Sequence, residues 1–445
     1  MIINLPHKVD FIINELYRNG FEAFAVGGCV RDSLLSRTPG DWDIATNALP
    51  DDIIDVFNKT IPTGMKHGTI TVLIEKEPFE VTTYRVDGEY KDNRRPEKVE
   101  FVSSIQEDLS RRDFTINAMA YNYREGLIDH FNGQQDLNNK IIRSVGNADL
   151  RFKEDALRML RCIRFSAQLQ FSIEEDTFNS MIKNSSLIKN ISHERIRTEL
   201  NKILLCEKPS SAFIQLEKSS LLKYILPEVQ KMVGFDQKNP HHDKDIFIHT
   251  LTVMDNTPKD LYLRLAGLFH DIAKPVTFSM DKKGIGHFYG HDKVGTELTE
   301  KILRRLTYDN KTVDIVKKLV REHMIMFDRP KDKTIKKLIN RIGSKNMPLL
   351  FQLQRADLRS SAPPFDYSNI EYMEKKSELI LENKEPLSIK DLNITGENLM
   401  KELNLQQGKT IGDILNYLLD RVLENPELND YNKLLNLAKK FFNSL

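Results

Sequence analysis

The chain of 445 residues is 40% hydrophobic and 29% charged, a composition typical of a soluble protein with room for roughly three domains. Its 65 basic and 64 acidic side chains leave a net charge of +1, which excludes a global positive field, so an RNA-binding surface would have to be a local patch. Three widely separated cysteines argue against a disulfide framework, and we find no leader sequence and no apolar run of membrane-spanning length, so we expect a cytoplasmic protein.

The first strongly patterned stretch follows an expected helix (residues 9–18) and an expected short strand (22–26). Residues 27–32 read GGCVRD, so that two glycines interrupt the strand and the chain turns into a helix. Adjacent glycines let the backbone approach a ligand closely, and free N–H groups at a helix start attract anions. Gly28 and Arg31 are therefore predicted phosphate contacts.

Asp41 and Asp43 lie two residues apart at the start of a second expected strand (42–46). The period of a strand sends both carboxylates to the same face. They repel each other unless a cation lies between them, and Mg²⁺ held together with substrate phosphates is the usual answer. We predict that this pair binds Mg²⁺ and is catalytic. Taken separately, the two features also fit a glycine turn and a polar strand edge.

In this order, the strand, the glycine turn, the helix and the Asp pair resemble the nucleotidyltransferase signature of the DNA polymerase β superfamily. More narrowly, residues 27–46 (GGCVRDSLLSRTPGDWDIAT) resemble the first motif of bacterial tRNA nucleotidyltransferases (CCA-adding enzymes, class II) and their poly(A) polymerase relatives. The resemblance continues through residues 108–120 (DLSRRDFTINAMA), which match the second motif, and 129–146, which match the third, a hinge. It implies that Arg112 contacts the triphosphate and ribose.

Two strands (68–74 and 79–85) and a charged loop (85–101) separate the first two motifs. Glu80 on the second strand is a candidate third carboxylate, although an exposed strand glutamate is an equal alternative. Relatives that add only the two cytidines lack such a loop as a class. Its presence here, with Asp92, Arg95 and Pro96, implies that the terminal adenosine is also added.

Residues 152–165 predict one helix with an apolar stripe, and a row of Asp155, Arg158, Arg161 and Arg164 recurs every third residue along its other side. A solvated face with one ion pair is the alternative. The row resembles the fourth family motif, EDxxRxxR, in which the Asp and the first Arg read the incoming base. Residues 193–200 (HERIRTEL) resemble the fifth motif, which supports that helix.

Base reading by this pair has a simple chemical logic. Cytosine and adenine both present an amino donor beside a ring-nitrogen acceptor, so that Asp155 can accept while Arg158 donates. Guanine and uracil place an N–H where Arg158 needs an acceptor, and the resulting unpaired polar groups would reject them. Arg161 and Arg164 are then expected to be free for phosphates.

Seven of the 11 histidines lie between His241 and His323. Residues 263–269 predict a buried helix that ends in His-Asp. The ordered set resembles the HD phosphohydrolase domain, whose helices gather such side chains around one or two divalent metals, and it implies these metal ligands: His249, His270, Asp271, His291, His323 and Asp357. Histidine and carboxylate mixtures suit Ni²⁺, Mn²⁺, Co²⁺ or Fe²⁺. A vestigial fold without metal is the alternative.

Together these features predict an α+β protein. A polymerase β-like nucleotidyltransferase head with a mixed sheet (1–140) is followed by an all-α neck and body for base recognition (141–236), an HD domain (237–362) and a helical tRNA-binding tail (363–445). The linker between the last two is expected at 359–364.

The resemblance implies a CCA tRNA nucleotidyltransferase that uses tRNA, CTP and ATP, needs Mg²⁺ and releases pyrophosphate, with an HD-domain phosphohydrolase activity as an addition. A poly(A) polymerase and an enzyme that adds only the terminal A remain alternatives. So do an HD-type hydrolase with a regulatory nucleotide-binding head and a tRNA-binding chaperone with relic motifs. The intact Asp41, Asp43, Asp155 and Arg158 argue against the last two.

Overall fold

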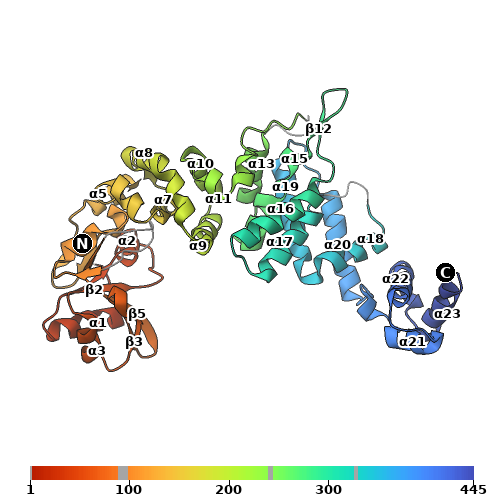
Figure 1. Cartoon of the computed structure of the whole chain (residues 1–445), viewed down its shortest axis with the longest axis horizontal. Helices are drawn as coiled ribbons and strands as arrows, with labels where there is room; N and C mark the ends of the chain where they lie inside the picture. Colours follow the sequence, from red (N-terminus) through yellow and green to blue (C-terminus); the bar gives the residue numbers. More distant parts are fainter. Residues whose placement is uncertain (1–2, 89–98, 239–243, 325–328, 445) are drawn as a thin grey trace. The chain divides into compact units, whose positions relative to one another are not determined.

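The computed structural model describes residues 3–88, 99–238, 244–324 and 329–444 (Figure 1). These residues divide into two compact units, Met1–Gln230 and Lys231–Leu445. Two parts of the predictions lie outside the described residues. They are the centre of the charged loop (85–101), with Asp92, Arg95 and Pro96, and His241, the first histidine of the histidine-rich segment. No helix among the described residues is long and apolar enough to cross a membrane.

The first unit contains the predicted mixed sheet. Its seven strands follow the spatial order β3 (Thr60–Gly64), β4 (Thr69–Ile74), β5 (Glu77–Thr83), β2 (Asp43–Thr46), β1 (Ala23–Val26), β8 (Ala120–Asn122) and β9 (Gly126–Ile128). Strand β1 is buried along its whole length and pairs antiparallel with β2, which pairs parallel with β5. The Asp pair is therefore placed at the start of a central strand.

The predicted hairpin is formed by β4 and β5, which pair from Thr69–Thr82 to Ile74–Glu77. Glu75 and Lys76 both have positive φ, 52° and 72°, as a two-residue hairpin turn requires. Because Ile44 of β2 lies opposite Val81, the same register places Glu80 beside Asp43. The ends of the expected charged loop form a further short antiparallel pair, β6 (Arg85–Asp87) and β7 (Val99–Phe101).

Helices surround the head sheet and form the rest of the first unit (Figure 1). They are α1 (His7–Arg18), α2 (Gly28–Leu34), α3 (Pro50–Val56), α4 (Ile105–Ser110), α5 (Gly133–Asn139), α6 (Ala148–Glu154), α7 (Leu157–Leu169), α8 (Glu175–Asn184), α9 (His193–Leu204), α10 (Pro209–Lys218), α11 (Leu222–Ile225) and α12 (Pro227–Gln230). A short parallel pair, β10 (Ile141–Ile142) and β11 (Ser172–Ile173), joins the start of α6 to the end of α7.

The single helix predicted over residues 152–165 is wrong, because the chain breaks between α6 and α7. Asp155 at the break has extended backbone angles, φ −139° and ψ 104°, and its Oδ1 accepts from the backbone N–H of Leu157 at 3.1 Å. An aspartate side chain that bonds the backbone two residues ahead competes with helix formation. Asp155 therefore precedes the helix that carries Arg158, Arg161 and Arg164.

In its described residues the second unit is helical apart from a small hairpin, β12 (Ser279–Met280) and β13 (Gly286–His287). Its helices are α13 (Ile246–Asn256), α14 (Leu261–Phe269), α15 (Lys274–Thr277), α16 (His291–Arg305), α17 (Asn310–Glu322), α18 (Asp332–Ile342), α19 (Met347–Ser360), α20 (Ser368–Glu382), α21 (Gly396–Leu403), α22 (Lys409–Glu424) and α23 (Tyr431–Phe442). Helix α14 is buried from Leu263 to Phe269, as predicted. The linker expected at 359–364 begins later, because α19 continues to Ser360.

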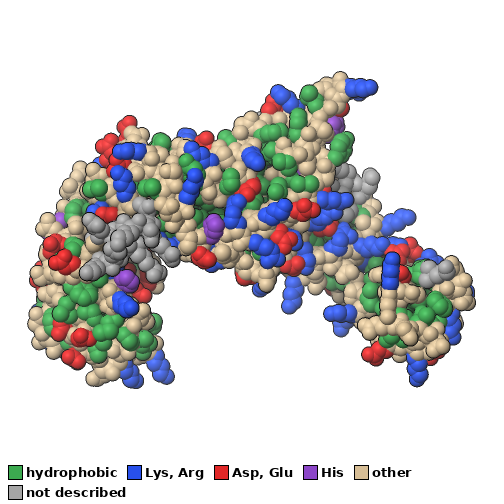
Figure 2. Space-filling view, viewed as in Figure 1, with side chains coloured by type: hydrophobic (Ala, Val, Ile, Leu, Met, Phe, Trp, Pro, Cys, Tyr) green, Lys and Arg blue, Asp and Glu red, His purple; other side chains and the backbone are tan. Residues whose placement is uncertain are grey.

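Basic and acidic side chains are interspersed over the visible face of the molecule (Figure 2). This pattern agrees with the net charge of +1. Some of the basic side chains are paired with acidic ones: on α18, Lys333 and Lys337 form salt bridges with Asp420 of α22.

Candidate active site and a second cluster of metal-ligating side chains

One cavity of about 450 Å³ in the first unit is lined by the predicted aspartates and nucleotide contacts of the head and neck, whereas the candidate Glu80 does not line it. Its lining includes Gly28, Arg31, Asp41, Asp43, Arg112, Asp155, Arg158, Arg161 and Arg164. These residues come from α2, the start of β2, the segment after α4, and the break and helix that follow α6. Segments far apart in the sequence thus form a single site.

The glycine turn brings the start of α2 against an arginine. Gly27 has φ +81°, and a Cβ there would lie 2.8 Å from Nη1 of Arg112. The backbone angle favours glycine, and a Cβ at this position would displace the end of the Arg112 side chain. Arg31 is buried, donates to Oδ1 of Asn117 at 2.7 Å and pairs with Asp32 at 2.8 Å.

The two aspartates predicted to be catalytic, Asp41 and Asp43, concentrate negative charge. Desolvation raises the pKa of Asp43, and the charges of Asp41 and Glu80 raise it further, against the opposing effect of Arg112. Carboxylate oxygens that repel one another form a donor set that fits a hard divalent cation. The site therefore accommodates such a cation, with Asp41 and Asp43 as the groups that would hold it.

Two arginines of the cavity are held by one buried carboxylate. Asp108 accepts from Nε and Nη2 of Arg111 at 2.9 and 2.7 Å and from Nη2 of Arg112 at 3.2 Å. Burial would raise the pKa of Asp108, but Arg112 and Arg111 lower it overall. Asp108 thus fixes the direction in which both guanidinium groups point.

Arg161 and Arg164 are not free, contrary to the prediction. Arg161 donates from Nε to Asp113 at 2.8 Å, and Arg164 donates from Nε to Glu199 at 2.5 Å. Arg161 and the hydrogen bond from Asn117 lower the pKa of Asp113 to about 2 despite its burial. The guanidinium of Arg164 also lies 3.9 Å from the ring centroid of Phe165. Any phosphate contact by these arginines would add to an existing partner.

Asp155 and Arg158 are likewise held in place. Arg195 of α9 donates to both carboxylate oxygens of Asp155, at 3.1 and 2.7 Å. Arg158 donates to Glu154 at 2.7 Å and to the backbone oxygens of Arg151 and Arg111. Its side chain is buried, with 8% of the residue exposed, so the alternative of a solvated face is wrong.

Sequence reasoning missed several residues that line the cavity: Arg111, Asp113, Asn117, Leu157, Phe165 and Arg195. The first three lie inside the second motif, so the motif itself was a usable signal. Arg195 lies in the fifth motif, which predicted support for a helix but no contact with Asp155. Phe165 has the pattern of a core residue and gave no signal.

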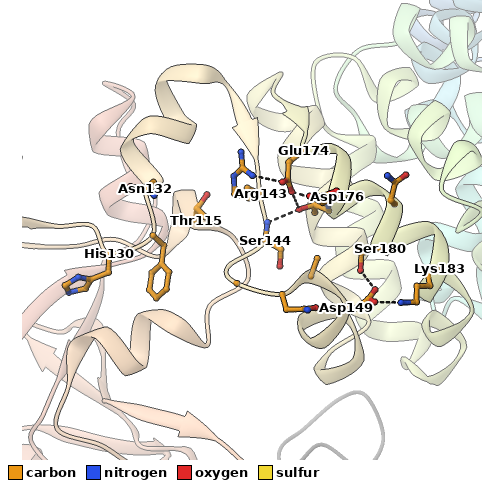
Figure 3. Close-up of a pocket in the computed structure, with 16 residues that line it drawn as sticks. Thr115, His130, Asn132, Arg143, Ser144, Asp149, Glu174, Asp176, Ser180 and Lys183 are labelled. Atoms are coloured by element: carbon orange, nitrogen blue, oxygen red, sulfur yellow. Dashed lines mark hydrogen bonds and ion pairs between the residues drawn. The ribbon is translucent and has the colours of Figure 1, made fainter.

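A larger cavity of about 650 Å³ lies elsewhere in the first unit (Figure 3). Residues of the segment predicted as a hinge (129–146) form part of its lining, and it shares no lining residue with the first cavity. Its polar side chains bond across it, since Arg143 pairs with Glu174, and Asp149 pairs with Lys183 and accepts from Ser180. These contacts tie α6 and α8 to the end of the head, which is a structural role.

In the second unit, the six predicted metal ligands converge. His249 comes from α13, His270 and Asp271 follow α14, His291 begins α16, His323 follows α17, and Asp357 lies on α19. The ligand atoms of His249, His270 and Asp271 lie within 4.8 Å of one another, as do those of Asp271, His291 and His323. Nε2 of His249 is also 3.0 Å from Asp357. Asp271 belongs to both groups.

The histidine orientations are those of a metal site. Nδ1 of His270, His291 and His323 lies 2.8, 2.8 and 2.7 Å from a backbone oxygen. Donation from Nδ1 fixes the tautomer and leaves Nε2 as the ligand atom. Nε2 of His270 is buried and forms no well-aligned hydrogen bond among the described residues, but it lies 3.2 Å from Oδ2 of Asp271 and 3.7 Å from Oδ1 of Asp357. A buried ring nitrogen this close to two carboxylates fits a bound cation.

Without a cation, protons and a lysine offset the buried negative charge. Although burial lowers the pKa of His270, Asp271 and Asp357 raise it overall to about 9. Lys274 lies 2.8 Å from Asp271 and bonds to Gln237. Burial lowers the pKa of His323 to about 4. The cluster therefore balances charge internally, and a divalent ion would replace the proton on His270.

Comparison with known families first defines the class of protein. Residues 23–143 match the model of the "Poly A polymerase head domain", residues 170–232 that of the "Probable RNA and SrmB- binding site of polymerase A", and residues 246–358 that of the "HD domain". With the mixed-sheet head and the helical second unit, these matches define a nucleotidyltransferase that carries an HD domain.

Full-length relatives define the family. The CCA-adding enzyme of Ligilactobacillus salivarius (strain UCC118) is 33% identical over 444 residues, which is 99% of this chain and 98% of the relative. The CCA-adding enzyme of Geobacillus thermodenitrificans (strain NG80-2) is 50% identical over 214 residues, so that match spans only about half of each chain, 48% and 53%. The crystal structure of the Bacillus stearothermophilus CCA-adding enzyme in complex with CTP has a TM-score of 0.75 and 27% identity, covering 98% of this chain and 96% of that one. The chain belongs to the CCA-adding enzymes, a family of tRNA nucleotidyltransferases.

Proposed function

We propose that the protein adds C, C and A to tRNA 3′ ends from CTP and ATP without a template. The observation that carries this proposal is that Asp41, Asp43, Asp155 and Arg158 all line one cavity. The cavity thus combines a reactive part, Asp41 and Asp43, with a base-recognising part, Asp155 and Arg158. Its volume of about 450 Å³ is suited to one nucleotide together with the 3′ end of a tRNA.

Chemistry occurs at the carboxylate end of the cavity. A Mg²⁺ ion held by Asp41 and Asp43 would lower the pKa of the tRNA 3′-hydroxyl and neutralise the triphosphate. The 3′-oxygen bonds to the α-phosphorus, the bond from that phosphorus to the bridging oxygen breaks, and pyrophosphate leaves while the hydroxyl proton passes to solvent. Arg112, packed against Gly27, binds the triphosphate near the glycine turn. No covalent intermediate with the protein is needed.

Base selection occurs at the other end. Asp155 accepts from the amino group shared by cytosine and adenine, and Arg158 donates to the neighbouring ring nitrogen. This arrangement admits both nucleotides, which favours CCA addition over an activity restricted to adenosine. The centre of the loop associated with adenosine addition lies outside the described residues, and the assay below distinguishes CCA addition from poly(A) polymerase and A-only activities.

The test is direct. Purified protein is incubated with Mg²⁺, tRNA lacking CCA, and each labelled nucleotide singly and in combination, and the products are sequenced. We expect two cytidines followed by one adenosine. If the protein adds no cytidine to tRNA lacking CCA and adds A only to a tRNA that already ends in CC, or if it adds many A residues, one of the alternatives would replace this proposal.

The second cluster favours a further, hydrolytic function. We infer that His249, His270, Asp271, His291, His323 and Asp357 hold one or two transition-metal ions, Ni²⁺, Mn²⁺, Co²⁺ or Fe²⁺, and that the site hydrolyses phosphate esters. The convergence of buried Nε2 of His270 with the carboxylates of Asp271 and Asp357, at 3.2 and 3.7 Å, supports this inference. Metal analysis and assays of phosphomonoesters and 2′,3′-cyclic phosphodiesters with each metal test it. A protein that retains no metal and hydrolyses neither substrate would contradict it.

A further inference from the structure

Arg195 holds Asp155 through both of its carboxylate oxygens. Nη1 donates to Oδ1 at 3.1 Å and Nη2 donates to Oδ2 at 2.7 Å, the parallel arrangement of a bidentate pair. Arg195 lies in the first turn of α9 and lines the same cavity as Asp155. The contact therefore joins two separate elements inside the site.

Counting hydrogen bonds shows what this contact leaves available. An ionised carboxylate has about two acceptor positions on each oxygen. Oδ1 accepts from Arg195 and from the backbone N–H of Leu157, so both of its positions are used. Among the residues that the structure describes, Oδ2 accepts only from Arg195. Asp155 thus keeps one acceptor position, on Oδ2, which matches the single amino group that cytosine and adenine share.

The partner residue is restricted in a similar way. Nη1 of Arg158 donates to Glu154 and to the backbone oxygen of Arg151, and Nη2 donates to the backbone oxygen of Arg111. Within the described part of the chain, one Nη2 hydrogen and the Nε hydrogen of Arg158 have no partner and remain for a ligand. A single free acceptor beside these free donors reproduces the pattern that reads cytosine and adenine.

We propose that Arg195 is a positioning residue for base selection, which acts through Asp155 by fixing which oxygen of that carboxylate faces the base. This inference rests on the proposed nucleotidyltransferase function and assigns a specificity role to a side chain outside the Asp155–Arg158 pair. Without Arg195 the carboxylate turns about its side-chain torsions, and its second oxygen can accept the ring N–H of uracil or guanine. Discrimination then falls because the mismatched bases find a partner.

Helix α9 also contacts Arg164, the last arginine of the row Arg158, Arg161 and Arg164. Glu199 lies four residues after Arg195, one turn along α9, and binds Arg164 at 2.5 Å. Ile196, Leu200 and Ile203 anchor the other face of α9 in the core. Arg195 therefore works from a rigid support rather than from a loop, which is what a positioning role requires.

The experiment compares Arg195→Lys and Arg195→Met with wild type. Lysine keeps the charge but cannot bridge two oxygens, and methionine removes both properties. We expect incorporation of UTP and GTP relative to CTP to rise by about tenfold or more, since one good polar contact decides a base at roughly that level. The affinity for tRNA should stay unchanged. Arg197→Lys is the matched control, because Arg197 lies on the same helix and does not line the cavity.

A double-mutant cycle separates positioning from simple support of the fold. If Arg195 acts through Asp155, adding Arg195→Met to Asp155→Ala should change base preference no further. Equal slowing with all four nucleotides at unchanged preference, with or without a lower Tm, would overturn the inference. The wild-type assay keeps the two proposals apart. If wild-type protein adds no nucleotide, the proposed function fails, whereas unaltered selectivity in the Arg195 variants removes this inference alone.

Discussion

Asp41 and Asp43 place two like charges at the start of the central strand β2, with Glu80 on the neighbouring strand β5. Asp41→Ala or Asp43→Ala should remove addition of both C and A by about a thousandfold or more, because cation-held charge is worth several kcal/mol in the transition state. Addition by each variant is measured with CTP and ATP separately. Asp55→Asn, an exposed position on α3, serves as the control. Near-normal addition by either variant would place the metal elsewhere.

The raised pKa of Asp43 also predicts a stability effect. A carboxyl group whose pKa is raised by folding binds its proton more tightly in the native state, so the charged form costs stability as pH rises through that range. Asp43→Asn removes this cost. At neutral pH without divalent ions its Tm should equal or exceed that of wild type, and added Mg²⁺ should stabilise only the wild type. Thermal melts with and without Mg²⁺ measure both effects, and a large loss of Tm in the variant would contradict them.

Gly27 combines a positive φ with a close approach to Arg112 of the nucleotide cavity. Gly27→Ala should cost about 1 kcal/mol of stability through its positive φ and should also displace Arg112, so that nucleotide addition falls sharply. Gly20 offers a matched control, since its φ is +88° but a Cβ there meets nothing within 4 Å. Gly20→Ala should therefore lose stability and keep activity. If the two variants had equal activity, nucleotide addition would not depend on the position of the Arg112 side chain.

At the scale of elements, Asp271 connects the two ligand groups that five elements of the second unit bring together. Asp271→Asn should remove bound transition metal and phosphate-ester hydrolysis while CTP and ATP addition stays nearly unchanged, because the other active site lies in the first unit. Metal content and both activities are measured on the same preparation. His291→Ala provides a second variant if the first is unstable. Loss of nucleotide addition in a folded variant would contradict the independence of the two sites.

The elements themselves were largely predictable, since alternation marked the strands and a 3.6-residue period marked the helices. The break at Asp155 was not, because it arises from one side-chain bond to the backbone two residues ahead. The partners of Arg161 and Arg164 were also hidden. They lie 48 and 35 residues away in the sequence, and only the packing of α7 against α9 and the head brings them close. Local pattern thus identified which residues form the site but not how each is held.

At the scale of the whole molecule, the chain consists of two compact units, with the nucleotide cavity in the first and the histidine cluster in the second. We expect two calorimetric transitions that respond to different ligands. CTP with Mg²⁺ should raise the transition temperature of the first unit only, because at a hundredfold excess over Kd it adds about 2.7 kcal/mol to that unit's free energy of unfolding. Mn²⁺ or Ni²⁺ at low concentration should raise only the transition temperature of the second unit. A single transition that both ligands shift equally would mean that the two units unfold together.

The pairing of Arg195 with Asp155 and of Glu199 with Arg164 constrains the length of the chain as well as its composition. Inserting one residue between Arg195 and Glu199 would rotate the second side chain by about 100° relative to the first, so α9 could no longer meet both partners. Substitutions at exposed positions such as Thr198 leave that spacing intact. Along this turn of α9, variation among relatives should therefore appear as substitutions and never as insertions or deletions, and an aligned set of family sequences would test this.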